Sequence, residues 1–150
     1  MGKIQHYGSV KVPVEIVEAA DKVKLQSYSF TKPVDFDVHS FANLPGGSDF
    51  IADLSEFLDL DPTTLDVVFF SCCSGAEMHT DKLDPNKFKS TTYVIPVILP
   101  EKGKKVLFTE QEEENIKLFN IYEFNHEEPH GLWLDDIESG CVVLMIGVLK

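Results

Sequence analysis

The chain reads STTYVIPVIL over residues 90–99, a β-branched run that ends at Pro100. Two other apolar runs lie on either side of it, LDVVFFSCC over residues 65–73 and CVVLMIGVL over residues 141–149. Each run has the length of a strand, and turn-forming residues punctuate the sequence around them. The sequence therefore predicts three β-strands rich in buried side chains.

Shorter strand patterns fill the intervals between these runs. They cover residues 104–109, 116–124 and 131–134. Strands spaced by about 8 to 15 residues, without alternating helices, favour two packed antiparallel sheets over a parallel sheet. The predicted fold class is mostly β, a sandwich or jelly roll, and the length of 150 residues predicts one domain spanning residues 1–150.

The first 64 residues are expected to hold two further strands and one helix. Residues 10–17 and 24–30 show short β patterns, held to edges or bends by Pro13 and Pro33. Ser48 is a suitable N-cap for a helix over residues 49–60. The apolar face of this helix would consist of Phe50, Ile51, Leu54, Phe57 and Leu58.

The charge of the chain is strongly negative. It has 25 acidic and 13 basic residues, a formal net charge of −12, and every base is a lysine. Such a surface disfavours binding to nucleic acid or to an anionic membrane and is compatible with a basic peptide or protein as substrate or partner. Three cysteines, two of them adjacent, and no secretory signal pattern predict a cytoplasmic location.

One spacing could carry chemistry. His79 and Asp81 stand two residues apart, so in an extended segment both side chains point to the same side, and His130 follows later in the chain. Two imidazoles and one carboxylate on one face of an octahedron hold non-haem Fe(II) in many oxygenases. Since 25 of 150 residues are acidic, five histidines give roughly one such pair by accident, and His126 with Glu128 forms another. A solvated histidine with an acidic neighbour is the alternative interpretation.

Three segments together resemble the aspartyl/asparaginyl β-hydroxylase-like branch of the Fe(II)/2-oxoglutarate oxygenases. They read VFFSCCSGAEMHTDK over residues 68–82, TTYVIPVIL over residues 91–99 and NIYEFNHEEPHGL over residues 120–132. The resemblance covers residues 65–149. It implies a double-stranded β-helix (jelly roll) with one supporting helix.

The resemblance also implies a set of site residues. It makes His79, Asp81 and His130 the iron ligands. The cosubstrate strand falls on residues 91–93, where the hydroxyls of Thr91, Thr92 and Tyr93 could bind a carboxylate of 2-oxoglutarate. The arginine that the family places about ten residues after the distal histidine is absent, and Lys89, with Lys87 in reserve, is the candidate replacement. A lysine supplies a point charge without the paired donors of arginine.

Two hypotheses of function follow. The first is an Fe(II)/2-oxoglutarate-dependent hydroxylase, with iron and the small-molecule cosubstrate 2-oxoglutarate as cofactors. The alternative is a non-catalytic acidic jelly-roll binding or inhibitory protein that has lost the cosubstrate clamp. Among the remaining residues, we interpret His126 as a turn residue or a partner of the metal site, and Trp133 as a rim aromatic or a wall of the substrate mouth. The predicted core contains Phe69, Val94, Ile95, Val97, Leu118, Phe124, Val143 and Leu144.

Overall fold

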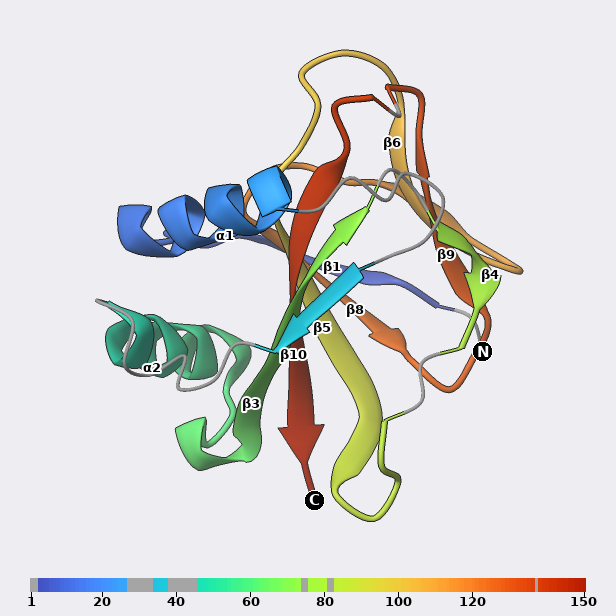
Figure 1. The fold of residues 1–150 in the computed structure, drawn as a ribbon. Helices are drawn as coiled ribbons and strands as arrows, with labels where there is room; N and C mark the ends of the chain where they lie inside the picture. The colour runs from blue at the N-terminus through green and yellow to red at the C-terminus, as the bar shows by residue number, and fades with distance from the viewer. Residues whose placement is uncertain (1–2, 27–33, 38–45, 74–75, 81–82, 137) are drawn as a thin grey trace.

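The computed structural model describes residues 3–26, 34–37, 46–73, 76–80, 83–136 and 138–150. In these residues ten strands form two antiparallel sheets (Figure 1). The larger sheet has the order β1–β8–β5–β10–β3–β2, formed by Gln5–Ser9 (β1), Asn120–Asn125 (β8), Phe88–Ile98 (β5), Cys141–Leu149 (β10), Leu65–Cys73 (β3) and Val34–Asp37 (β2). The smaller sheet has the order β4–β9–β6–β7, formed by Ala76–His79 (β4), His130–Leu134 (β9), Lys105–Thr109 (β6) and Glu113–Asn115 (β7).

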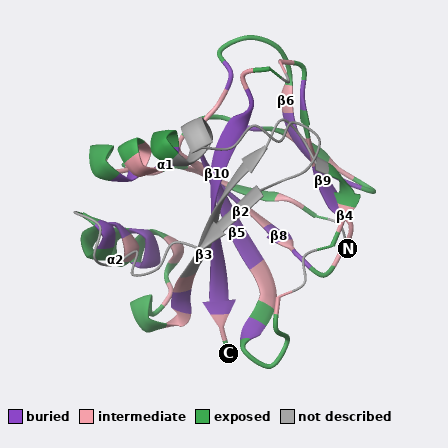
Figure 2. Ribbon diagram, in the orientation of Figure 1, coloured by how far each residue is buried: buried purple, intermediate pink, exposed green. Residues whose placement is uncertain are grey.

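The strand β10 lies at the centre of the larger sheet, between β5 and β3. Its sequence is apolar at almost every position because both faces of the strand are covered. Val142, Leu144 and Ile146 face a core shared with the helices, whereas Val143 and Met145 face a second core that also contains residues of the smaller sheet. All but the last of its nine residues are buried, as the purple colour of the strand shows (Figure 2).

Two helices, α1 (Val14–Gln26) and α2 (Gly47–Leu58), cover the outer face of the larger sheet (Figure 1). Their buried residues Ile16 and Ala20 from α1, and Phe50 and Leu54 from α2, join the core on that face. Both pairs are four residues apart, which is the spacing of one helical face. A short 3-10 helix, η2 (Pro62–Thr64), connects α2 to β3.

The helix α1 corrects the prediction of strands over residues 10–17 and 24–30 and of a single supporting helix. The carbonyl of Pro13 accepts hydrogen bonds from the N–H groups of Ile16 and Val17, so the chain turns into a helix directly after the proline. Alternating valines suggested a strand, but the spacing of Ile16 and Ala20 decides which residues are buried. Residues 27–30 lie outside the described part of the chain.

The start of α2 also differs from the prediction. Gly46, with a φ of 80°, occupies the N-cap position without a side-chain hydrogen bond, so Ser48 is not the cap. The helix ends at Leu58 because Asp59 adopts a left-handed conformation with a φ of 56°. Phe57, expected on the apolar face, is 47% exposed.

The jelly-roll fold class is confirmed, together with most of the predicted core. Val94, Ile95, Val97, Phe124, Val143 and Leu144 are buried. The prediction that Leu118 belongs to the core is wrong, because its side chain is 44% exposed. A turn at Leu118 and Phe119, where Phe119 has a φ of 62°, interrupts the strand expected over residues 116–124. The side chain of Phe69 lies outside the described residues. No helix of the described chain is both long and apolar enough to cross a membrane.

Candidate functional site

Two histidines predicted as ligands lie opposite each other on neighbouring strands of the smaller sheet. β4 ends at His79 and β9 begins at His130, and the two residues are cross-strand partners. Their ring centroids are 4.6 Å apart, with the ring planes inclined by 55°. His130 is 4% exposed, and His79 is half-buried. The fold therefore brings together two side chains that are 51 positions apart in the sequence.

Both imidazoles have the same hydrogen bond at Nδ1. Nδ1 of His79 lies 2.6 Å from the carbonyl oxygen of Glu77, and Nδ1 of His130 lies 2.8 Å from that of Glu128. A carbonyl oxygen only accepts hydrogen bonds, so in each ring Nδ1 donates its proton and a neutral ring carries its lone pair on Nε2. A backbone carbonyl that fixes the tautomer and orientation of the ring is typical of histidines that bind metal ions.

An aromatic ring and a threonine flank His130. The ring of Phe124, on β8, lies 4.4 Å from the imidazole of His130 between centroids. Thr109, on β6, is the cross-strand partner of His130 and is also buried. These neighbours limit the contact of His130 with water.

A second buried polar pair lies on the adjacent strands. Oγ1 of Thr92, on β5, lies 2.7 Å from Nδ1 of His126, in the turn after β8. Thr92 is 0% exposed and His126 2% exposed. Thr92 is the cross-strand partner of Phe124, so both belong to the sheet face that meets His130.

These residues form one group of buried polar side chains. The polar cluster consists of Thr92, Thr109, His126 and His130, which account for four of the five buried polar residues in the described chain. Burial of a polar group is costly unless it is hydrogen-bonded; Thr92 and His126 share a hydrogen bond, and Oγ1 of Thr109 accepts from the backbone N–H groups of Gln111 and Glu112. Phe124 connects the two pairs, since it is the cross-strand partner of Thr92 and its ring contacts His130. The sequence left the role of His126 open and gave no local signal that it pairs with Thr92. The two residues are 34 positions apart, and only the register of β5 and β8 brings them together.

The predicted cosubstrate residues are not all brought to this cluster. Tyr93 belongs to the core on the opposite, helix-covered face of β5. There it contacts Tyr7 edge-on, at 6.0 Å between centroids, and burial, followed by the charge of Glu123, raises the pKa of its hydroxyl. Thr91 alternates with Thr92 and so shares the face of Tyr93.

The predicted cationic partners lie at the surface. Lys89 is exposed near the start of β5, and Lys87 forms an exposed ion pair with Asp66 at 3.6 Å. Every lysine whose side chain is described is exposed except Lys105, which is half-buried and donates to the carbonyl of Pro100 at 2.8 Å.

The third predicted metal ligand, Asp81, lies outside the described residues. Within the described part of the chain, no group of three or more histidine, cysteine or acidic side chains is arranged to hold a metal ion. The structure thus brings two of the three predicted ligands together.

Comparison with known proteins gives similarity at the level of the fold. No family model matches the sequence, and no curated protein matches it. Among solved structures, the chain is similar to a prolyl-4-hydroxylase from Pseudomonas putida, with a TM-score of 0.55 and 10% identity over 99% of this chain and 91% of that one. It is also similar to AviO1 from Streptomyces viridochromogenes Tue57, with a TM-score of 0.54 and 10% identity over 98% of this chain and 90% of that one. At this level of identity, the likeness shows a shared fold.

Proposed function

We propose that this protein is an Fe(II)/2-oxoglutarate-dependent oxygenase of the hydroxylase type, related to the aspartyl/asparaginyl β-hydroxylase-like branch. In the proposed site, His79, Asp81 and His130 bind the iron. The observation that carries the proposal is the facing pair His79 and His130, each with Nδ1 fixed by a backbone carbonyl. The fold similarity to a prolyl-4-hydroxylase supports the same reaction class.

The separation of the two rings fits a shared ion. Two imidazoles that bind one metal ion through Nε2 at about 2.1 Å, at a right angle to each other, have centroids about 4.6 Å apart. The centroids of His79 and His130 are 4.6 Å apart. A carboxylate from Asp81 would complete the two-histidine, one-carboxylate set that selects non-haem iron.

The residues of the chain would then have distinct tasks. The carbonyls of Glu77 and Glu128 orient the two imidazoles, and Phe124 shields His130 from water. When bound, the iron supplies the activation of oxygen for hydroxylation of a C–H bond, which side chains alone do not provide.

The cosubstrate 2-oxoglutarate is proposed to lie against the start of β5. Lys89 is the proposed partner of its distal carboxylate. Thr92 and His126 add polar groups on the face of the sheet that meets His130. An exposed lysine gives a weak ion pair, so the affinity for 2-oxoglutarate should depend strongly on ionic strength.

One observation favours a second candidate function, a non-catalytic binding or inhibitory protein. No lysine with a described side chain is buried, and the sequence has no arginine. A buried distal carboxylate without a cation would cost several kcal/mol. If the distal carboxylate of 2-oxoglutarate has no cationic partner, the protein would act as a binding or inhibitory protein that does not turn over 2-oxoglutarate.

Metal binding is tested by anaerobic titration with Mn(II), followed by electron paramagnetic resonance. We expect one site that is lost in His79→Ala and in His130→Ala and retained in the control His6→Asn, which alters an exposed histidine of β1. Circular dichroism confirms that each variant folds. Equal binding by His79→Ala and the unchanged protein would contradict the proposed ligand set.

Turnover is tested by the conversion of 2-oxoglutarate to succinate with iron and ascorbate, which needs no knowledge of the primary substrate. Lys89→Met should raise the KM for 2-oxoglutarate by up to about fivefold, equivalent to about 1 kcal/mol, as expected for an exposed ion pair, while Mn(II) binding stays unchanged. Unchanged kinetics would remove Lys89 from the proposal. A metal-loaded protein that neither binds nor decarboxylates 2-oxoglutarate would favour the binding protein.

A further inference from the structure

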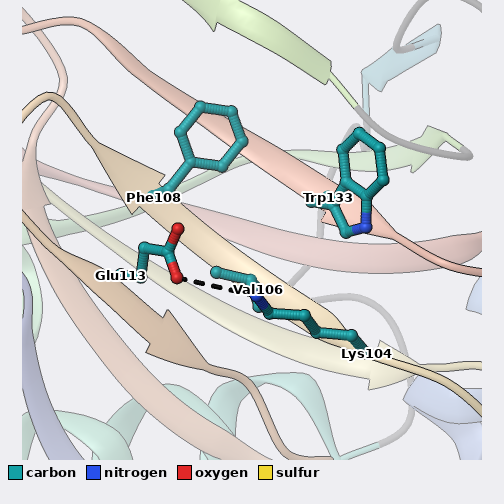
Figure 3. A pocket seen from close by; sticks show the side chains of 5 residues that line it. All are labelled: Lys104, Val106, Phe108, Glu113 and Trp133. Carbon is teal, nitrogen blue, oxygen red and sulfur yellow. Dashed lines mark ion pairs between the residues drawn. The ribbon is translucent and has the colours of Figure 1, made fainter.

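The outer face of the smaller sheet carries a hollow, on the side of the sheet opposite to His130. Its volume is about 250 Å³, and it is lined by Lys104, Val106, Phe108, Glu113 and Trp133 (Figure 3). Val106 pairs with Trp133 across β6 and β9, and Phe108 pairs with Glu113 across β6 and β7. Because Leu107 and Leu132 alternate with these residues and pack inward, the lining side chains stand on the outer face.

The walls of the hollow are aromatic and accessible. Trp133 is 58% exposed, and Phe108 is half-buried. Both rings stand above the sheet at the edges of the hollow (Figure 3). Aromatic rings offer an apolar surface and a negative face that attracts cations.

Trp133 is held in a fixed orientation. Its Nε1–H donates to Oδ1 of Asp135 at 2.8 Å, and Oδ2 of the same carboxylate accepts from the backbone N–H of Lys104 at 2.9 Å. These hydrogen bonds, that of Lys104 first, hold the pKa of Asp135 below its ordinary value. An indole that is already oriented loses little conformational freedom when a ligand binds.

A carboxylate lies at the mouth of the hollow. Glu113 lies 3.7 Å from Nζ of Lys104, and the two side chains are 67% and 54% exposed. An ion pair this exposed is weak and readily exchanged. Lys104 shows that an ammonium group on an alkyl chain can reach this carboxylate beside the aromatic walls.

We propose that this hollow binds a lysine or arginine side chain from a basic segment of a partner protein. The guest cation replaces Lys104 at the Glu113 carboxylate and lies against the ring of Trp133, while its alkyl stem packs on the ring of Phe108, above the buried Val106. The charge of the chain favours this occupant, because its formal net charge is −12 and a carboxylate, that of Glu113, lines the hollow. This inference concerns the other face of the sheet and does not depend on the proposed oxygenase activity.

The chain contains a single tryptophan, so the intrinsic fluorescence of the folded protein reports directly on the hollow. The probe is the peptide acetyl-Gly-Lys-Gly-Lys-Gly-amide, and its matched control carries norleucine in place of both lysines. We expect a saturable change in Trp133 fluorescence with the lysine peptide and at least about fivefold weaker binding of the norleucine peptide. The affinity of the lysine peptide should fall between about 50 and about 300 mM NaCl.

Variants separate this site from general attraction to an acidic protein. Glu113→Gln should lower the affinity for the lysine peptide about fivefold. Lys104→Met should raise that affinity, because it removes the lysine of the chain that competes for Glu113. Glu56→Gln, which removes an exposed acid of α2, is the control and should leave the affinity unchanged.

Three results would overturn the proposal. Equal binding of the norleucine peptide would mean an apolar groove without cation selectivity. Equal effects of Glu113→Gln and Glu56→Gln would mean non-specific charge attraction. Self-association in sedimentation velocity that is lost in Trp133→Ala would assign the face to a second copy of the chain.

Discussion

Replacing Thr92 with valine isolates the contribution of one buried hydroxyl. Valine has nearly the shape of threonine and suits a strand, so the change removes Oγ1 with little effect on packing. That oxygen lies 2.7 Å from Nδ1 of His126, and both residues are almost fully buried. The substitution therefore takes a hydrogen-bond partner from a buried imidazole.

The expected loss of stability follows from the burial of this pair. Removing one partner of a buried hydrogen bond costs about 1–3 kcal/mol, because water cannot replace the lost group. For a chain of this size, each kcal/mol lowers the Tm by about 2–4 °C, so the total shift should be about 2–12 °C. Thr91→Val is the matched control, since Thr91 is half-buried on the other face of the same strand, and its effect should stay within about 0.5 kcal/mol.

Urea unfolding followed by circular dichroism measures both variants under the same conditions. The midpoint should fall for Thr92→Val with an unchanged m-value, since the surface exposed on unfolding is the same. A double-mutant cycle with His126→Leu should give a coupling energy of at least about 0.5 kcal/mol. Equal stability of Thr92→Val and Thr91→Val, or additive effects in the cycle, would refute the reasoning.

Other substitutions test the turns and the core. Gly103→Ala would place a Cβ 2.7 Å from Cβ of Asp135 at a φ of 86°, so urea unfolding should show a loss of about 1–3 kcal/mol, larger than that of Gly8→Ala, where no atom lies within 4 Å. Leu144→Ala, at a position with 0% exposure, should lower the free energy of unfolding by about 2–5 kcal/mol, and a loss below about 1 kcal/mol would contradict its place in the core. The backbone N–H of Thr63 donates a hydrogen bond that lowers the pKa of Asp61 below its ordinary value of 3.8. The ionised Asp61 carboxylate therefore stabilises the fold above pH 3.8, and this stabilisation is lost as the pH falls through the lowered pKa. The stability difference between Asp61→Ala and the unchanged protein, measured by thermal unfolding, should accordingly shrink from about pH 7 to about pH 3.

The parts of the fold that the sequence predicts well are those in which local pattern and burial agree. β10 and β3 have the predicted bounds. An apolar run that ends at turn residues on both sides forms a strand of that length in a sheet whose two faces are covered. The start of the chain was harder to predict. In α1, valines favour a strand locally, while tertiary packing against the sheet selects the helical face of Ile16 and Ala20.

The candidate site was predictable only in part for a related reason. A motif identifies residue types, and the resemblance supplied His79 and His130, which the fold brings face to face. The choice between Thr92 and Tyr93 depends on which face of β5 each occupies, and that is set by pairing with strands far away in the sequence. The local pattern of β5 is apolar on both sides, so it contains no signal of which hydroxyl faces the histidines.

The central place of β10 has a consequence for how the protein folds during translation. β3 and β5 are not neighbours in the sheet, since β10 separates them and hydrogen-bonds to both. Residues 65–98 therefore leave the ribosome without their main pairing partner, and at about 5–20 residues per second they wait for seconds until residues 141–149 emerge. During that interval the edges of two apolar strands remain open to other nascent chains, so the yield of native protein in the cell should depend on chaperones that bind extended apolar segments.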